Sequence, residues 1–366
     1  MKKIVICGGH LSPALALIGQ LQKEKDLEII FFGRKFATEG SANTSAEFKE
    51  INSQNLKFVN ITAGRLSRKL TIPALISYLK IPLGFIESFF NLLILRPKLI
   101  VSFGGYISPP VVFCGWLLGI DSICHEQPVV PGLANKINSL FVRKIFVSWP
   151  DTAKYFPENK TKLIGNLTRE EIFRTASKNR KIVSFVKNNP GYILISGGNQ
   201  GSHFINQIIF KNTKKLNHPI FHILGTANYK NDHQNAKRLK SKNYFSCDFV
   251  DSSDIGIVFN NAKFIIGRSG ANTVWETAVL GKPAVFIPLP HSASDEQFAN
   301  AKVLQNAGSA VILEQKNLSD KNFLKTIRDF NQNLDSHQKK ADEFKKTLPQ
   351  KASLVLKSEI LKSFPN

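Results

Sequence analysis

A chain of 366 residues with 43% hydrophobic side chains has room for two folded domains, which excludes disorder over most of its length. Its formal charge of +22, from 49 basic and 27 acidic residues, predicts an anionic partner: nucleic acid, an anionic membrane surface or a phosphorylated substrate. A lysine-rich soluble surface without such a partner is the alternative.

The first part of the chain alternates apolar runs with helical patterns. We expect strands at Lys3–Cys7, Leu27–Gly33, Leu56–Ile61, Leu99–Gly105, Ser122–His125 and Lys144–Ser148, the last of this half. We expect helices after the first strand at Ser12–Leu17, then at Ile72–Leu95 and Pro109–Leu118. This alternation predicts a parallel sheet with helices on both faces.

The most apolar tract, residues 70–101, is interrupted by prolines and charged side chains, so we expect no membrane span. Met1-Lys2-Lys3 leads directly into the first strand, which predicts no secretory signal. The four cysteines form no CxxC pair and lie in or beside apolar runs. They are expected to be buried thiols in a reducing compartment.

The second part repeats the alternation. We expect strands at Tyr192–Ser196, Phe221–Leu224, Tyr244–Val250, Ala262–Gly267 and Ala284–Pro288. A helix is expected at Thr273–Leu280, and the Lys-rich end is helical, with Pro349 before Leu354–Leu361. We predict an α/β protein of two Rossmann-like, doubly wound domains facing across a cleft. The domains are residues 1–165 and 166–345, and a C-terminal helix in residues 346–366 packs back on the first domain.

One local pattern occurs twice: an apolar strand, a glycine turn and the start of a helix. The first copy ends in Gly8-Gly9-His10, and the second in Gly197-Gly198-Asn199-Gln200-Gly201. Such a turn presents unpaired N–H groups at a positive helix end, which favours phosphate binding.

A third turn, Gly267–Glu276, is the strongest candidate for a diphosphate site. Thr273 is positioned to cap the helix, and Ser269 or Thr273 could donate a hydroxyl to a phosphate. Glu276 could accept both hydroxyls of a ribose. The alternative is an ordinary capped helix with Glu276 as its capping-box partner.

Two further segments carry polar side chains at expected strand ends. Gln297 and Asn300 share a helix face and could bind sugar hydroxyls, although a solvated helix start is the alternative. His10 and Glu126 could supply a base for a hydroxyl nucleophile, although a histidine beside a glycine turn is often structural. The sequence has no HExxH or DxD motif, so we expect no metal.

Seven strings in order resemble the MurG family, the cytoplasmic N-acetylglucosaminyltransferases of peptidoglycan synthesis. They begin at Gly8, Phe103, His125, Gly165, Gly197, Arg268 and Pro288. The resemblance implies a GT-B fold and an inverting, metal-independent transfer of GlcNAc from UDP-GlcNAc, with no cofactor. The acceptor would be the C4 hydroxyl of undecaprenyl-pyrophosphoryl-N-acetylmuramyl pentapeptide, at the cytoplasmic face of the membrane.

The resemblance also implies roles for individual residues. His10 would be the base, with Glu126 as a supporting or rival candidate. The acceptor and its pyrophosphate would contact Gly8, Gly9, His10, Gly104, Gly105, Tyr106 and Pro128. UDP-GlcNAc would contact Arg169, Asn199, Gln200, Val250, Ser269, Gly270, Ala271, Asn272, Thr273, Val274, Trp275, Glu276, Gln297 and Asn300.

The sequence departs from the family pattern in the first glycine loop, which is shortened to Cys7-Gly8-Gly9-His10, and at Pro128, Asn199 and Leu167. The shortened loop leaves a non-catalytic nucleotide-sugar-binding partner as an alternative. A UDP-GlcNAc 2-epimerase, which shares the two-domain architecture and the donor, is another. Without RNP-like aromatics, a KH loop or a zinc finger, we expect no nucleic-acid partner.

Apolar residues in the long helical tract have two interpretations. They could form a basic-rimmed patch on the anionic inner leaflet, or they could belong to the helical core. The residues concerned are Leu75, Leu79, Ile81, Phe85 and Phe89.

Overall fold

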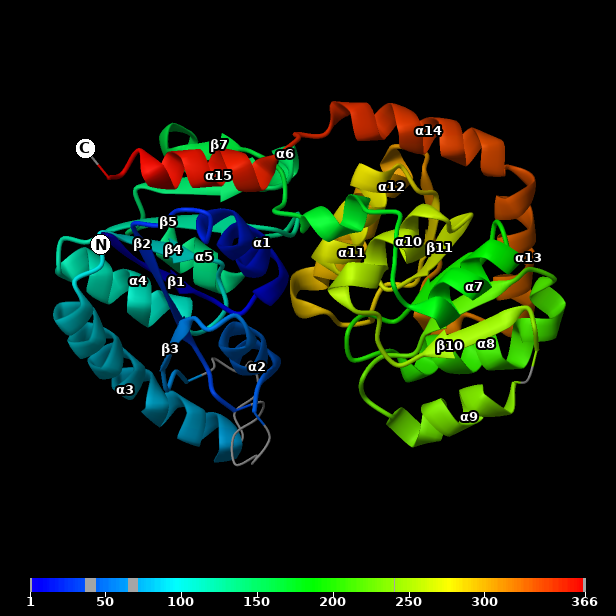
Figure 1. Ribbon diagram of the computed structural model, residues 1–366, viewed down its shortest axis with the longest axis horizontal. Coiled ribbons are helices and arrows are strands. Elements are labelled where there is room, and N and C mark those ends of the chain that lie inside the picture. Colours follow the sequence, from blue (N-terminus) through cyan, green and yellow to red (C-terminus); the bar gives the residue numbers. More distant parts are fainter. Residues whose placement is uncertain (1, 37–43, 65–71, 240, 365–366) are drawn as a thin grey trace. The chain divides into compact units, whose positions relative to one another are not determined.

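The structure, a computed structural model, describes residues 2–36, 44–64, 72–239 and 241–364. The chain divides into two compact units. Unit 1 is Met1–Arg169 with Pro349–Asn366, and unit 2 is Glu170–Leu348. Each unit alternates strands and helices along the chain (Figure 1).

Unit 1 is built on a seven-stranded parallel sheet in the order β3-β2-β1-β4-β5-β6-β7. Its strands are β1 (Lys2–Cys7), β2 (Leu27–Gly33), β3 (Lys57–Asn60), β4 (Leu99–Ser102), β5 (Asp121–Glu126), β6 (Lys144–Val147) and β7 (Thr161–Leu163). Its helices are α1 (Leu11–Leu21), α2 (Ala46–Ser53), α3 (Ile72–Leu95), α4 (Ser108–Leu117), α5 (Leu133–Asn138), α6 (Pro150–Ala153) and α15 (Ala352–Leu361). The strand order reverses between β1 and β4, and ligands of such sheets bind at the carboxyl ends beside the reversal.

Unit 2 repeats this plan with six parallel strands in the order β10-β9-β8-β11-β12-β13. Its strands are β8 (Ile193–Ser196), β9 (Ile220–Ile223), β10 (Tyr244–Cys247), β11 (Phe264–Gly267), β12 (Ala284–Phe286) and β13 (Ala310–Ile312). Its helices are α7 (Arg180–Asn188), α8 (His203–Leu216), α9 (Asp232–Arg238), α10 (Ser252–Asn260), α11 (Ala271–Leu280), α12 (Glu296–Asn306), α13 (Asp320–Gln332) and α14 (Leu334–Thr347). Here the reversal lies between β8 and β11.

The predicted fold class is confirmed: both sheets are parallel and doubly wound, and their central strands are buried apolar runs. The prediction that Lys144–Ser148 is the last strand of the first half is wrong, because β7 follows at the sheet edge. Both β7 and the unpredicted β13 have three residues. β7 contains Thr161 and Lys162 and is largely exposed, so it has no apolar run to reveal it, whereas β13 is an apolar run of only Ala310, Val311 and Ile312.

Helix α3 differs from the expectation that no segment of residues 70–101 is apolar enough to span a membrane. Its segment Ser77–Leu95 is long and apolar enough to cross a membrane by length and composition, and only 22% of it is buried. One side nevertheless belongs to the core of unit 1, where Leu92 and Leu95 are buried and Phe85 and Phe89 pack on the same cluster. The side chain of Leu75 lies outside the described residues.

Helix α15 returns to unit 1 at the end of the chain (Figure 1). Leu356 and Ile360 join the cluster that contains Leu17 of α1. Glu359 of the same helix accepts hydrogen bonds from Lys144 at 2.7 Å and Lys162 at 3.3 Å. Apolar packing and a buried carboxylate therefore hold α15 on unit 1 together.

We predict that Glu359→Gln lowers the thermal stability of unit 1 by a few degrees. The hydrogen bond from Lys144 lowers the pKa of Glu359 to about 2, so its carboxylate stabilises the folded state above the unfolded pKa of about 4.3. This contribution is lost as the pH falls toward 2. Thermal unfolding should therefore show a difference between wild type and variant that shrinks from pH 5 to pH 2. Glu343→Gln is the control, because Glu343 pairs with Lys340 on the solvent-exposed side of α14. Equal losses of thermal stability in Glu359→Gln and Glu343→Gln would contradict the conclusion that the Glu359 carboxylate holds α15 on unit 1.

Candidate functional site

In unit 1 the turns that follow β1 and β4 touch through their backbones. The Gly9 N–H donates to the Gly104 carbonyl at 3.0 Å. A Cβ on Gly8 would lie 2.7 Å from the Gly104 oxygen, and one on Gly105 would lie 2.7 Å from the Gly9 nitrogen. Gly8 and Gly105 also have positive φ angles, of 137° and 76°. The two predicted acceptor turns are therefore a single backbone surface that only glycine allows.

His10 lies beside this surface as the N-cap residue of α1. Its side chain makes no capping hydrogen bond and is half-buried. Burial lowers its pKa below the usual 6.5, so the imidazole is neutral at pH 7. A neutral imidazole can accept a proton, as a general base must.

His125 and Glu126 end β5 at the same sheet edge. Burial lowers the pKa of His125 to about 4, and its Nε2 lies 3.0 Å from the Gly165 carbonyl, so Nε2–H is the donor. The Glu126 carboxylate accepts from the N–H groups of Gln127 at 3.2 Å and Gly132 at 3.1 Å. Glu126 thus organises its own loop, which favours His10 over Glu126 as a base.

The remaining predicted acceptor residues surround these turns. Tyr106 packs against the apolar cluster that includes Ile107. The Pro128 carbonyl accepts from the Thr152 hydroxyl at 2.9 Å, which fixes the loop after β5.

In unit 2 the turn after β8 is also glycine-rich. The Gly201 N–H donates to the Gly198 carbonyl at 3.0 Å, and both glycines have positive φ angles. Asn199 and Gln200 project from it with exposed side chains. The Thr226 N–H donates to the Asn199 carbonyl at 2.9 Å, which joins this turn to the one after β9.

The turn after β11 leads into α11 with a cap that differs from the prediction. Gly270, which has no side chain to cap the helix, is the N-cap residue, so the prediction that Thr273 caps is wrong. Thr273 lies inside the first turn, and its carbonyl accepts from the Thr277 hydroxyl. The N-cap residue of α11 therefore makes no side-chain capping hydrogen bond, which suits a helix N-terminus that binds an anion. Ser269 adds a hydroxyl that is 0% exposed and has no hydrogen-bond partner among the described residues.

The other predicted donor residues divide into two groups. Ala271, Asn272 and Glu276 are half-buried around the first turns of α11. Val274 and Trp275 are 0% and 1% exposed, so we assign their side chains to the core of unit 2.

The loop before α12 packs on the turn after β11. The Asn300 side-chain amide donates to the Ser269 carbonyl at 3.3 Å, and Asn300 is fully buried. The Gln297 amide oxygen accepts from the Leu289 N–H at 3.0 Å. Both residues thus shape the loop, and only Gln297 reaches the surface of the unit.

Sequence reasoning missed two residues at this edge. Phe249 follows β10 and is 50% exposed, whereas the predicted Val250 is 4% exposed. Arg268 donates to the carbonyls of Ile287 and Pro288, to Ser202 and to Gln315. The sequence signals were its place immediately after an apolar strand and at the start of one of the seven strings, and neither distinguishes a buried arginine from an exposed one.

The predicted donor contact Arg169 and the expected absence of a metal site are the remaining predictions. Arg169 ends unit 1 and is half-buried. No group of three or more His, Cys, Asp or Glu side chains suited to a metal ion occurs within residues 2–36, 44–64, 72–239 and 241–364.

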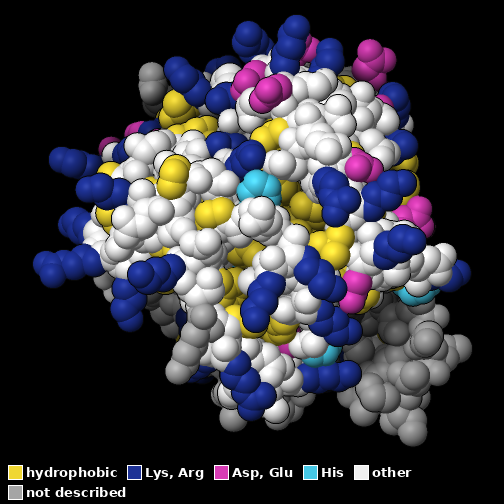
Figure 2. Space-filling view, turned by 90° about the vertical axis from the view of Figure 1, so that its right-hand side faces the viewer, with side chains coloured by type: hydrophobic (Ala, Val, Ile, Leu, Met, Phe, Trp, Pro, Cys, Tyr) yellow, Lys and Arg dark blue, Asp and Glu magenta, His cyan; other side chains and the backbone are white. Residues whose placement is uncertain are grey.

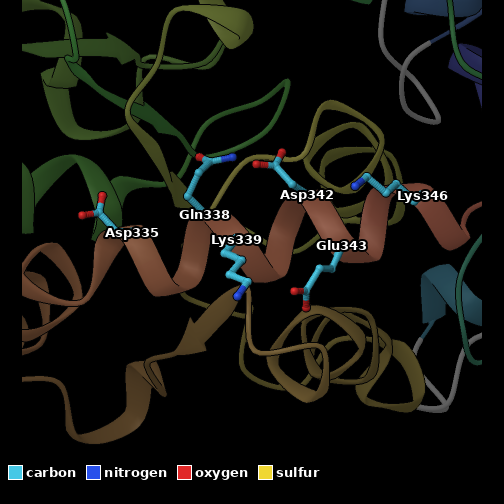
Figure 3. Close-up of a pocket in the computed structure, with 6 residues that line it drawn as sticks. All are labelled: Asp335, Gln338, Lys339, Asp342, Glu343 and Lys346. Carbon is cyan, nitrogen blue, oxygen red and sulfur yellow. The ribbon is translucent and has the colours of Figure 1, made fainter.

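A cavity of about 430 Å³ lies elsewhere, along α14 (Figure 3). It is lined by Asp335, Gln338, Lys339, Asp342, Glu343 and Lys346. Gln338 donates to the carbonyl of Gly281, the C-cap residue of α11, at 2.8 Å. The cavity is therefore at the end of α11 opposite the candidate anion site, and Figure 3 shows its side chains pointing to different sides of α14.

Two family models match the chain in succession. Residues 7–147 match the glycosyltransferase family 28 N-terminal domain, and residues 192–355 match the glycosyltransferase family 28 C-terminal domain.

Curated relatives match nearly the whole chain. A protein of Treponema denticola is 31% identical over 98% of this chain and 95% of its own length. One of Clostridium tetani is 31% identical over 99% of both chains. Both are named UDP-N-acetylglucosamine–N-acetylmuramyl-(pentapeptide) pyrophosphoryl-undecaprenol N-acetylglucosamine transferase.

Solved structures share the fold. A crystal structure of MurG from Acinetobacter baumannii has a TM-score of 0.73 and 25% identity, and the match covers 99% of this chain and 100% of that one. A UDP-GlcNAc 2-epimerase from Neisseria meningitidis has a TM-score of 0.66 at 12% identity, with 99% and 100% coverage. The second likeness concerns the fold alone.

We predict that Gly105→Ala destabilises unit 1 more than Gly119→Ala. Both glycines have φ near 70°, so each substitution adds about 1–2 kcal/mol of left-handed backbone strain. Only at Gly105 does the new Cβ also meet backbone, because Gly119 has no atom within 4 Å of that position. Denaturant unfolding measures both costs. Equal losses of unfolding free energy would show that the two acceptor turns are not in contact.

Proposed function

The chain belongs to the MurG family of glycosyltransferases, and on that premise we propose that it transfers GlcNAc from UDP-GlcNAc to the C4 hydroxyl of a polyprenyl-pyrophosphate-linked muramyl pentapeptide. The observation that carries this proposal is the 31% identity to transferases of that name along 98–99% of the chain. The two sheet edges support it. Unit 1 offers a glycine surface beside a neutral histidine, and unit 2 offers uncapped helix amides.

The proposed reaction is a single displacement that inverts the anomeric carbon. The acceptor oxygen bonds to this carbon, its proton passes to His10, and the bond to the β-phosphate oxygen breaks as UDP leaves. His10 suits this role because its imidazole is neutral and free of a capping bond. The amides at the N-terminus of α11 would stabilise the charge that develops on UDP. We propose that these groups suffice without a metal ion.

We expect the wild-type chain to transfer radiolabelled GlcNAc from UDP-GlcNAc to a short-chain muramyl-pyrophosphoryl lipid equally well with and without a chelator. His10→Ala should reduce kcat by about 10²–10⁴-fold and leave UDP affinity unchanged, because only the base is removed. The wild-type rate should fall as the pH falls through a midpoint below 6.5, where His10 becomes protonated.

Glu126→Gln is the matched control for the rival base. If the fall in rate at low pH disappeared in Glu126→Gln but persisted in His10→Ala, Glu126 would be the base, and the assignment of His10 as the base would be contradicted. Loss of transfer in chelator would contradict metal independence, and no transfer by the wild type would contradict the proposed function itself.

Helix α3 supports attachment to the cytoplasmic face of the membrane. Six exposed apolar side chains lie along one side of the helix: the first four follow one another at intervals of three or four residues, and the last two lie three and four residues after the fourth. This α3 stripe is Leu79, Leu83, Ile86, Phe90, Leu93 and Ile94. Exposed Trp116 and Leu117 end α4, which packs on α3. Of the residues predicted for a membrane patch, Leu79 belongs to the stripe, whereas Phe85 and Phe89 pack on the core.

Basic side chains would strengthen the attachment of this helix to the membrane. Arg96 and Lys98 are exposed just beyond the stripe, and the whole chain carries +22. Figure 2 shows the side of the molecule that lies at the right of Figure 1, on unit 2, where Lys and Arg side chains are also spread over the surface, with some Asp and Glu among them. We propose that the stripe inserts into the leaflet while Arg96 and Lys98 face anionic headgroups.

We predict that the double variant Leu79→Gln/Ile94→Gln binds vesicles containing anionic lipid about tenfold or more weakly than wild type, because two exposed apolar side chains no longer enter the bilayer. Vesicle sedimentation measures the binding. Leu163→Gln, an equally polar change at a 40% exposed residue on β7, should bind as wild type does. Unchanged binding of the double variant would show that the stripe is not the contact.

A further inference from the structure

All of the net positive charge of unit 2 lies in one part of its chain. Residues 174–242 contain thirteen Lys and Arg and a single acidic residue, Asp232. Residues 243–348 contain twelve basic and twelve acidic residues, so their charges balance. A uniformly lysine-rich protein would spread its excess charge over both parts. The excess in residues 174–242 therefore needs an explanation of its own.

The one acidic residue of this part is used inside the unit. Asp232 begins α9 and is 0% exposed. Its carboxylate accepts hydrogen bonds from His203 Nδ1 at 2.9 Å, Asn206 Nδ2 at 2.8 Å and Gln207 Nε2 at 3.1 Å, all on α8. Asp232 therefore ties α9 to α8 and gives the surface above them no exposed carboxylate.

Helices α8 and α9 form one surface of unit 2. Strands β8, β9 and β10 are parallel neighbours in the sheet, and the two helices connect them in turn. Right-handed crossovers in one direction place both helices on the same face, where they lie side by side (Figure 1). This α8–α9 surface carries five exposed basic side chains, Lys211, Lys214, Lys215, Lys237 and Arg238. No acidic and no large hydrophobic side chain of these two helices is exposed.

The position of these cations separates them from the candidate donor site. Both helices begin after the carboxyl ends of their strands and run back to the amino edge of the sheet. Lys214 and Lys215 lie in the last turn of α8, and Lys237 and Arg238 lie in the last turn of α9. Cations at helix C-termini are favourable. The charges therefore gather near the sheet edge opposite the turn after β11.

The chemistry of the α8–α9 surface favours an extended anionic partner. Four of its five cations are lysines, whose ammonium groups are point charges without the fixed donor geometry that arginine offers to bases and single phosphates. The two helices expose no aromatic side chain on which a base could stack. Attraction by charge alone remains, and the headgroups of an anionic bilayer attract each Lys or Arg close to their surface.

We infer that the α8–α9 surface binds anionic lipid headgroups, as a second membrane contact that acts by charge alone. The inference rests on the proposed function, in which the α3 stripe brings the chain to an anionic leaflet. The two contacts differ in their physical basis, because the stripe inserts apolar side chains and the α8–α9 surface exposes none. Salt screens charges and leaves apolar insertion in place, so only the α8–α9 contact is weakened by it.

Sedimentation of the full chain with vesicles of phosphatidylcholine, alone or mixed with phosphatidylglycerol, tests this inference. The α8 variant, Lys211→Gln/Lys214→Gln/Lys215→Gln, removes three exposed charges. It should bind the mixed vesicles about 10–100-fold more weakly than wild type and bind phosphatidylcholine alone as wild type does. This deficit should disappear at about 1 M salt, whereas the deficit of Leu79→Gln/Ile94→Gln should persist.

Lys339→Gln/Lys340→Gln/Lys346→Gln is the matched control. It removes the same charge from exposed positions on α14, where acidic side chains are interspersed with the lysines. Its affinity for the mixed vesicles should stay within about threefold of wild type. Equal losses in the two triple variants would overturn the inference, because net charge alone would then govern binding. An α8 variant that binds as tightly as wild type would overturn it as well.

A labelled DNA oligonucleotide at the same ionic strength distinguishes a bilayer from a nucleic acid. If the α8 variant lost affinity for the oligonucleotide and kept its affinity for the mixed vesicles, nucleic acid would be the partner and the inference would be overturned. GlcNAc transfer to the short-chain acceptor in detergent should be unchanged in the α8 variant, because its substitutions lie away from the candidate donor site. Absence of transfer by the wild type would contradict the proposed function, while the vesicle measurements would still decide the role of the α8–α9 surface.

Discussion

Close backbone contact between neighbouring βα turns is the constraint on which both halves of the molecule depend. In unit 1 the Gly9 N–H donates to the Gly104 carbonyl, and in unit 2 the Arg268 N–H donates to the Ser196 carbonyl where β11 ends beside β8. Side chains at Gly8 or Gly267 would collide with these partners. Because the turns touch, helix N-termini gather at one edge of each sheet, and their N–H groups become available to a phosphate.

The two edges carry different functional side chains. Unit 1 combines its glycine surface with the histidines His10 and His125, both of which burial keeps neutral at pH 7. Such a surface can take a proton from a hydroxyl. Unit 2 combines uncapped amides with the buried charge of Arg268, which suits a leaving diphosphate.

The sequence predicted what depends on long apolar runs and glycine turns. The parallel sheets, the glycine turns and the helix at Ile72–Leu95 follow from periodicity and from the conformations that only glycine adopts, whereas the contact between the turns of unit 1 became visible only in the structure. What depends on side-chain environment was not predictable. Thr273 looks like a cap because of its residue type, but Gly270 has the capping geometry. Phe85 and Leu79 occur in the same apolar tract, and only packing distinguishes the core residue from the exposed one. The burial of Val274, Trp275 and Arg268 likewise depends on partners distant in the chain.

A crystal structure with bound UDP tests the central claim most directly. The account predicts diphosphate density on the N-terminal amides of α11, within reach of the Ser269 hydroxyl and above the Arg268 guanidinium. Density at another place, such as the cavity along α14 or the glycine surface of unit 1, would contradict it.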